Sequence, residues 1–159
     1  MTGQVTALER VVATEEIRCL KARYFRGLDT RDWDLLGSVF TQDAIFDTRD
    51  ALGAARPDEG SHDPFREQGY LTGRETIIAT LRAMGSTATY MVHHGHMPEI
   101  RVESAVRASA VWAMDDRVEW PEGAAALRSL RGFGHYHDEY ACIEGEWLSD
   151  VDCNEQRLR

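Results

Sequence analysis

The sequence predicts an α+β protein in which helices cover one face of a curved antiparallel sheet. Apolar residues recur at helical spacing over residues 8–40 and again over 72–85, whereas from residue 87 onward they alternate with a period of two. The helices therefore mostly precede the strands, and a parallel sheet would need helices between its strands. At 159 residues the chain suits one core, and we expect a single domain over residues 1–159.

The first helix is expected after Thr6-Ala-Leu-Glu9, which has the spacing of a capping box. Its apolar residues lie at helical spacing: Leu8, Val11, Val12, Ile17, Leu20, Tyr24 and Leu28. Gly27 is expected to end this helix. A second short helix is expected over residues 31–40, and residues 44–47 have the composition of a strand.

Residues 48–71 mix prolines, glycines and charges and are expected to form a long loop, which is either a binding segment or a mobile insertion. Thr72-Gly-Arg-Glu75 repeats the capping-box spacing and predicts a third helix that ends at Gly85. Four long strands are then expected over residues 87–102, 106–120, 127–143 and 146–156.

Composition excludes several classes of function. The formal net charge of −9 opposes nucleic-acid binding, because a phosphate backbone is bound by a basic stripe. No apolar run is long enough to cross a membrane, and the first residues lack the pattern of a secretion signal, so we expect a cytoplasmic protein without a membrane partner. The cysteines, Cys19, Cys142 and Cys153, show neither a disulfide framework nor a zinc-finger spacing.

A curved sheet covered by helices encloses an apolar interior, which is a natural site for a small molecule. Tyr24 shares the apolar stripe of the first helix, so its hydroxyl is expected to face this interior and to need a partner. Asp29 follows five residues later. Both residues also have ordinary structural interpretations, Tyr24 as a core tyrosine and Asp29 as the N-cap of the second helix. Asp32 and Asp34 are expected to be solvated or capping residues.

The first long strand carries His93, His94 and His96. Alternation places His93 on one face of the sheet and the other two on the opposite face. An inward histidine is either a hydrogen-bonded structural residue or, beside a carboxylate, a general base. A zinc site formed by this cluster, joined by His135 and His137, is a further alternative.

Two further segments carry polar groups toward the interior. One of Asp115 and Asp116 must point to the inner side of an otherwise apolar strand, although exposed strand ends would explain them equally well. Alternation also places Tyr136, Asp138 and Tyr140 on one face, and Tyr136 is the favoured pocket hydroxyl.

Several residues occur in the order that characterises a known family. They are Ile17, Leu20, Tyr24, Leu28-Asp29, Arg31-Asp-Trp33, Phe40, Asp43-Ala, Gly73-Arg, His93-His94, Tyr136, Asp138, Tyr140, Gly145 and Trp147. This set resembles the SnoaL-like branch of the NTF2-like superfamily from about residue 7 to residue 150. The resemblance implies a cone-shaped α+β barrel closed on one face by three helices. That superfamily includes scytalone dehydratase, ketosteroid isomerase, limonene epoxide hydrolase and polyketide cyclases.

Within the superfamily the pattern is nearest to the dehydratases, among them scytalone and bile-acid dehydratases, and to hexachlorocyclohexane dehydrochlorinase. In those enzymes an Asp–His dyad removes a proton, and the resemblance places this dyad at Asp29 and His93. It gives a functional role to Tyr24, five residues before the aspartate. It also places a further acidic residue at Asp116, with Asp115 as the alternate.

One position departs from the pattern. Those lyases carry an arginine shortly after the Tyr-x-Asp-x-Tyr segment, where this chain has Cys142, so any substrate contact made by that arginine is absent. Tyr136, Trp112 and Cys142 are the candidate substrate contacts, although a packing role is favoured for Trp112.

We therefore expect a dehydratase that needs neither metal nor organic cofactor. It would remove a proton next to a carbonyl of a hydrophobic cyclic or polyketide-like molecule and eliminate water. An isomerase or polyketide cyclase using the same cavity is one alternative, and a non-catalytic ligand-binding or assembly module is another. The sheet face that the helices leave uncovered predicts a homodimer or higher homo-oligomer.

Overall fold

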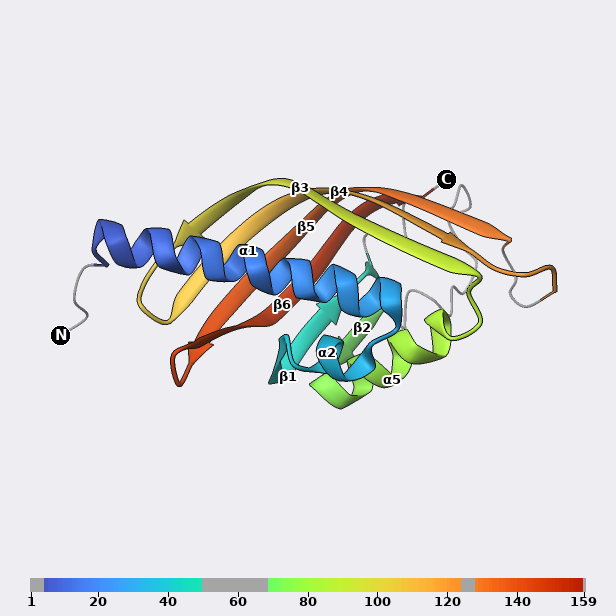
Figure 1. The fold of residues 1–159 in the computed structure, drawn as a ribbon, viewed down its shortest axis with the longest axis horizontal. Coiled ribbons are helices and arrows are strands. Elements are labelled where there is room, and N and C mark those ends of the chain that lie inside the picture. The colour runs from blue at the N-terminus through green and yellow to red at the C-terminus, as the bar shows by residue number, and fades with distance from the viewer. Residues whose placement is uncertain (1–4, 50–68, 124–127, 159) are drawn as a thin grey trace.

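The computed structural model describes residues 5–49, 69–123 and 128–158, which form three helices and six strands (Figure 1). The predicted loop over 48–71 lies mostly outside these residues. The helices are α1 (Ala7–Thr30), α2 (Trp33–Gly37) and α5 (Arg74–Gly85). The capping box that was predicted at the start of α1 is present, with the Thr6 hydroxyl accepting from the Glu9 backbone and the Glu9 carboxylate accepting from the Thr6 backbone.

Gly27 does not end α1, contrary to the sequence prediction. The helix continues to Thr30, and Arg31 follows in the left-handed conformation with a φ of 57°. Gly27 instead permits close helix packing, because a Cβ at this position would lie 3.0 Å from the Cβ of Leu36 in α2. The glycine therefore marks the place where α2 crosses α1.

The second predicted capping box, at Thr72, is absent. The N-cap of α5 is Gly73, with a φ of 85° and no side-chain cap. Thr72 pairs with Ile45 as the last residue of a strand, so its backbone belongs to the sheet. The expected end of this helix at Gly85 is confirmed.

The strands form one sheet in the order β2-β1-β6-β5-β4-β3, and their bounds are β1 Phe40–Asp47, β2 Tyr70–Thr72, β3 Tyr90–Val102, β4 Arg107–Glu119, β5 Ser129–Ile143 and β6 Glu146–Leu158. Only β1 and β6 pair in parallel. The second helix is shorter than the predicted 31–40, because the carbonyl of Val39 already accepts from Ser149 of β6. The α+β prediction is confirmed, but the sheet is curved and open, with β2 and β3 at its edges among the described residues.

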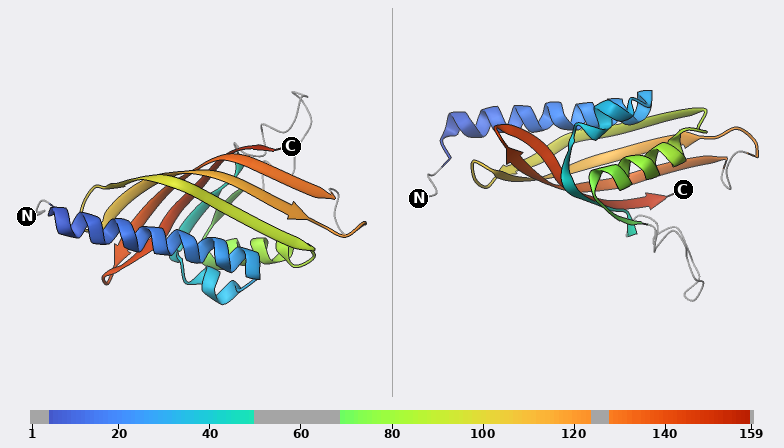
Figure 2. Two further views of the ribbon diagram at one scale, coloured as in Figure 1. Left: turned by 45° about the horizontal axis from the view of Figure 1, so that its top comes forward. Right: turned by 90° about the horizontal axis from the view of Figure 1, so that it is seen from below.

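The core lies between α1 and the inner face of the sheet. Figure 1 and Figure 2 show that α1 runs across the sheet and that α2 and α5 lie near the C-terminal end of α1. The inner face supplies large buried side chains, among them Trp112, Tyr136, Tyr140 and Trp147. Of the helices described, none combines the length and the apolar character that crossing a membrane requires.

Candidate active site

Asp29 lies in the last turn of α1 and does not cap α2. That cap is Asp32, whose Oδ1 accepts from the backbone N–H of Leu35 at 3.0 Å. The capping role expected for Asp32 is therefore confirmed, and the same alternative for Asp29 is wrong. Because α1 extends beyond Gly27, the carboxylate of Asp29 is carried to the edge strand β3.

The Asp29 carboxylate holds His93 at two points. Its Oδ1 lies 2.7 Å from Nδ1 of the imidazole, and its Oδ2 accepts from the backbone N–H of His93 at 3.2 Å. A carboxylate only accepts, so Nδ1 carries the proton and Nε2 is left as the basic nitrogen. The two side chains are 26% and 13% exposed, so the pair lies at the border between the interior and solvent.

Asp116 lies directly opposite His93 in the register of β3 and β4, and its side chain is buried. Burial raises the pKa of the Asp116 carboxyl above its usual value, and the positive form of His93 opposes this most strongly. Asp115 points to the other face of the sheet, where its Oδ1 lies 3.3 Å from Nδ1 of His94 and 3.0 Å from Nε2 of His96. Asp116 is thus the inward member of the pair.

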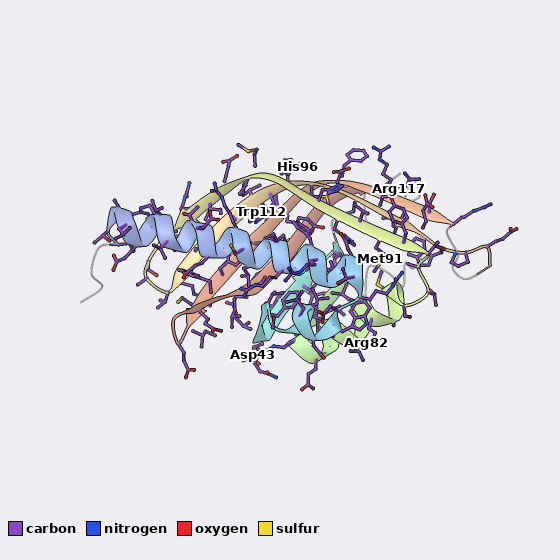
Figure 3. The ribbon with its side chains drawn as sticks, viewed as in Figure 1. Asp43, Arg82, Met91, His96, Trp112 and Arg117 are labelled. Atoms are coloured by element: carbon purple, nitrogen blue, oxygen red, sulfur yellow. The ribbon has the colours of Figure 1, made fainter. Side chains whose placement is uncertain are left out.

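The remaining histidines of the described strands belong to the outer face. His135 and His137 lie together there on β5, and Figure 3 shows His96 at the surface of β3. Within the part of the chain that the structure describes, no three histidine, cysteine or acidic side chains are arranged to hold a metal ion. The zinc alternative therefore finds no site among these residues.

Tyr136 joins Asp116 to the core. Its hydroxyl donates to Oδ2 of Asp116 at 2.8 Å, and its ring centroid lies 5.9 Å from that of Phe25 in α1. Phe25 in turn packs over Gly95 beside His93, where a Cβ would come within 2.6 Å of the phenyl ring. Tyr24 is buried as expected, but its hydroxyl is directed to Asp152 and not to Asp29 or His93.

The other two predicted substrate contacts, Trp112 and Cys142, differ in their position relative to His93. Trp112 lies near Gly95, where a Cβ would come within 3.4 Å of its ring. Trp112 is buried, and its Nε1 donates to the hydroxyl of Tyr140 at 3.0 Å, so it belongs to the polar core (Figure 3). Cys142 lies ten residues along β5 from Gly132, the residue that shares a register position with Asp116, so about 33 Å of extended strand separates it from the site. Cys142 therefore lies far from His93, and its role as a substrate contact stays a prediction.

Sequence reasoning missed a buried ion cluster next to the site. Nζ of Lys21 lies 2.9 Å from Oδ2 of Asp138 and 3.3 Å from Oδ2 of Asp152. The signal was present, because Lys21 lies within the apolar stripe between Leu20 and Tyr24. A lone charged residue on the buried side of a helix indicates an interior partner.

Two hollows of similar size lie elsewhere in the described part of the chain, and neither is lined by Asp29 or His93. One, of about 530 Å³, lies on the outer sheet face between β3, β4, β5 and β6. The other, of about 540 Å³, lies between α2 and α5 near Trp33 and Arg82. Beside the dyad the interior is occupied by aromatic side chains, chiefly Phe25 and Tyr136.

Comparison with known families accounts for this architecture. The family model described as the SnoaL-like domain matches residues 9–150. The chain belongs to the SnoaL-like family. The resemblance inferred from the ordered residues is therefore confirmed, together with the NTF2-like fold.

Solved structures share the fold at low sequence identity. A protein of Novosphingobium aromaticivorans, provisionally named a scytalone dehydratase, is 18% identical with a TM-score of 0.70, and the match covers 97% of this chain and 87% of that one. Hexachlorocyclohexane dehydrochlorinase type 3 of Novosphingobium barchaimii is 18% identical with a TM-score of 0.72, over 97% and 91% of the two chains. An NTF2-like protein of unknown function from Pseudomonas putida is 16% identical with a TM-score of 0.62, over 90% and 85%.

Proposed function

We propose that this SnoaL-like protein is a cofactor-independent lyase, a dehydratase in which Asp29 and His93 remove a proton from carbon. The observation that carries the proposal is the two-point contact between the Asp29 carboxylate and His93, which leaves Nε2 of the imidazole as a base. When Nε2 takes a proton, the adjacent carboxylate stabilises the imidazolium that forms.

Asp116 supplies the second proton transfer. Its raised pKa favours the protonated carboxyl, which donates to the departing hydroxyl of the substrate so that water leaves. Turnover then ends with His93 protonated and Asp116 ionised. Because the two residues face each other across β3 and β4, return of the proton from His93 to Asp116 restores both groups without a further reactant.

The surroundings of the dyad support a hydrophobic substrate. Phe25 and Tyr136 present aromatic rings beside His93, which suits a hydrophobic cyclic or polyketide-like carbonyl compound. Two of the similar structures are named for eliminations, a dehydration and a dehydrochlorination. Both reactions need a base for carbon-bound hydrogen and assistance to a leaving group.

The test separates proton removal from elimination. The protein is incubated in deuterated water with a panel of cyclic β-hydroxy ketones, and mass spectrometry records deuterium uptake next to the carbonyl and loss of water. Wild-type protein is expected to catalyse both, and His93→Ala neither, while circular dichroism shows an unchanged fold. Deuterium uptake without loss of water would favour an isomerase or cyclase, and equal rates in wild type and His93→Ala would exclude the proposed base.

His94→Ala is the matched control, because His94 occupies the next position on β3 and faces outward to Asp115. It is expected to retain full activity. A loss equal to that of His93→Ala would show that disturbance of β3, and not removal of the base, causes the effect.

A further inference from the structure

Lys21 is the only lysine of the chain, and its side chain is 3% exposed. The two carboxylates beside its Nζ, Asp138 and Asp152, face each other across β5 and β6. A second oxygen on each of these carboxyls, Oδ1, has no hydrogen-bond partner among the described residues. Two buried carboxyls therefore share a single ammonium.

The ammonium also lies over two aromatic rings. Its Nζ is 3.9 Å from the ring centroid of Tyr136 and 4.3 Å from that of Tyr24. A buried cation over an aromatic face is attracted to the ring and fixes its orientation. The hydroxyl of Tyr136 donates to Asp116, so one side chain meets Lys21 at its ring face and Asp116 at its hydroxyl.

Ionisable groups from every surrounding element face this interior: Lys21 and Tyr24 from α1, His93 from β3, Asp116 from β4, Tyr136, Asp138 and Tyr140 from β5, and Asp152 from β6. Among the described residues, this interior holds three buried carboxyls, those of Asp116, Asp138 and Asp152, and the buried ammonium of Lys21. Charges interact strongly in such a water-poor interior, so a change of charge in the cluster alters the proton affinity of Asp116.

We propose that Lys21, Asp138 and Asp152 are positioning residues that hold Tyr136 against Asp116 and set the protonation of the Asp116 carboxyl facing His93. This inference rests on the proposed function, in which protonated Asp116 assists the leaving group. Among the described residues the ion pairs of Lys21 are with Asp138 and Asp152 and not with Asp29, so the cluster acts through Asp116.

The directions of the pKa shifts of Asp152 and Asp116 support this arrangement. Burial, opposed chiefly by Lys21 and reinforced by the charges of Asp138 and then Asp116, raises the pKa of Asp152 to about 7. The Lys21 ammonium in turn lowers the pKa of Asp116. Each carboxyl therefore responds to ionisation of the other.

The direct test is a carboxyl-carbon NMR titration of Asp116 in the free protein, with aspartate labelled isotopically. Wild type is expected to show a main step and a smaller second step near pH 7, where Asp152 ionises. Asp152→Asn retains the ion pair of Lys21 with Asp138 and is expected to remove the second step. Lys21→Met is expected to move the main step upward by about one pH unit.

Glu139→Gln is the control, because Glu139 follows Asp138 on β5 but is exposed on the outer face. It is expected to leave the Asp116 titration unchanged. An Asp116 curve that is identical in wild type and Asp152→Asn overturns the proposal, even if Lys21→Met does not fold. A second step that persists in Asp152→Asn overturns it equally.

Activity distinguishes this proposal from the one on which it rests. With a substrate from the ketone panel, the alkaline limb of the pH profile of kcat is expected to shift upward in Lys21→Met, in parallel with the Asp116 titration. A shifted titration with an unshifted kcat profile overturns the positioning role. A shifted titration in a protein that turns over none of the panel overturns the proposed function and leaves the coupling of the cluster to Asp116 standing.

Discussion

The carboxylate of Asp29 accepts two hydrogen bonds from a single residue, one from the imidazole Nδ1 of His93 and one from its backbone N–H. The second bond matters for the tautomer of the ring. A backbone N–H only donates, so one carboxylate oxygen is committed to it and the other must receive the Nδ1 proton. Helix α1 and strand β3 are thereby linked at the residue that we propose as the base.

Asp29→Asn is expected to lower kcat by about 10²–10⁴-fold with little change in fold. The amide oxygen of asparagine must serve the backbone N–H of His93, which turns the amide NH₂ toward Nδ1. The ring then carries its proton on Nε2 and cannot accept one from substrate. Asp32→Asn is the control, because asparagine caps a helix as well as aspartate does, and it is expected to keep normal kcat.

Asp116→Asn is expected to reduce elimination strongly, whereas Asp115→Asn leaves it nearly unchanged. The two neighbours point to opposite faces, and only Asp116 faces His93, while Asp115 contacts two outer-face histidines. An amide cannot donate a proton to a departing hydroxyl. Deuterium uptake next to the carbonyl is expected to survive in Asp116→Asn, because His93 remains. Equal losses in the two variants would contradict the assignment.

Stability is expected to fall as pH rises through neutrality, because of Asp152. Its pKa is about 7 in the folded protein, against a usual value of 3.8, so the folded state binds this proton more tightly than the unfolded state between these values. The contribution to the free energy of unfolding is therefore full below about pH 4 and is lost as pH rises through about 7.

Urea unfolding of wild type and Asp152→Asn at about pH 5 and about pH 8 measures this contribution. Wild type is expected to lose more stability across the interval than the variant. Asp116, whose pKa burial also raises, contributes a slope of the same sign, so the difference between the two proteins measures Asp152 together with its coupling to Asp116. A slope that is the same in both proteins would show that Asp152 titrates at its ordinary pKa.

The order of helices and strands, and the faces of the strands, could be predicted because both depend on residue periodicity. Alternation alone placed His93 and His94 on opposite faces of the sheet, as the structure shows, but it did not identify the inward face. Helix boundaries were less predictable, because tertiary contacts decide them. Thr6 and Thr72 have the same local spacing, yet only Thr6 caps a helix, since Thr72 is paired in the sheet with β1.

The dyad could be inferred from the resemblance, but its geometry could not be inferred from spacing. Asp29 had an equally good local explanation as a cap, and only the extension of α1 past Gly27 removes it. The cluster of Lys21, Asp138 and Asp152 joins α1 to β5 and β6. The place of Lys21 in the apolar stripe of α1 indicates an interior partner, but no local pattern in a single sequence identifies Asp138 and Asp152 as that partner.

Gly27→Ala is expected to lower the free energy of unfolding by about 1–2 kcal/mol, although alanine favours a helix over glycine. The added Cβ would lie 3.0 Å from the backbone nitrogen of Leu36 and 3.1 Å from its Cα, and backbone cannot move aside as a flexible side chain can. Gly37→Ala is the matched control, because its Cβ would meet only a side-chain atom of Ile78 at an ordinary 3.8 Å. Urea unfolding is expected to show no loss for Gly37→Ala. Gly27 lies in the same turn of α1 as Asp29, so displacement of this turn by the added Cβ is also expected to lower kcat. A destabilised Gly27→Ala variant with full kcat would show that the site tolerates this displacement.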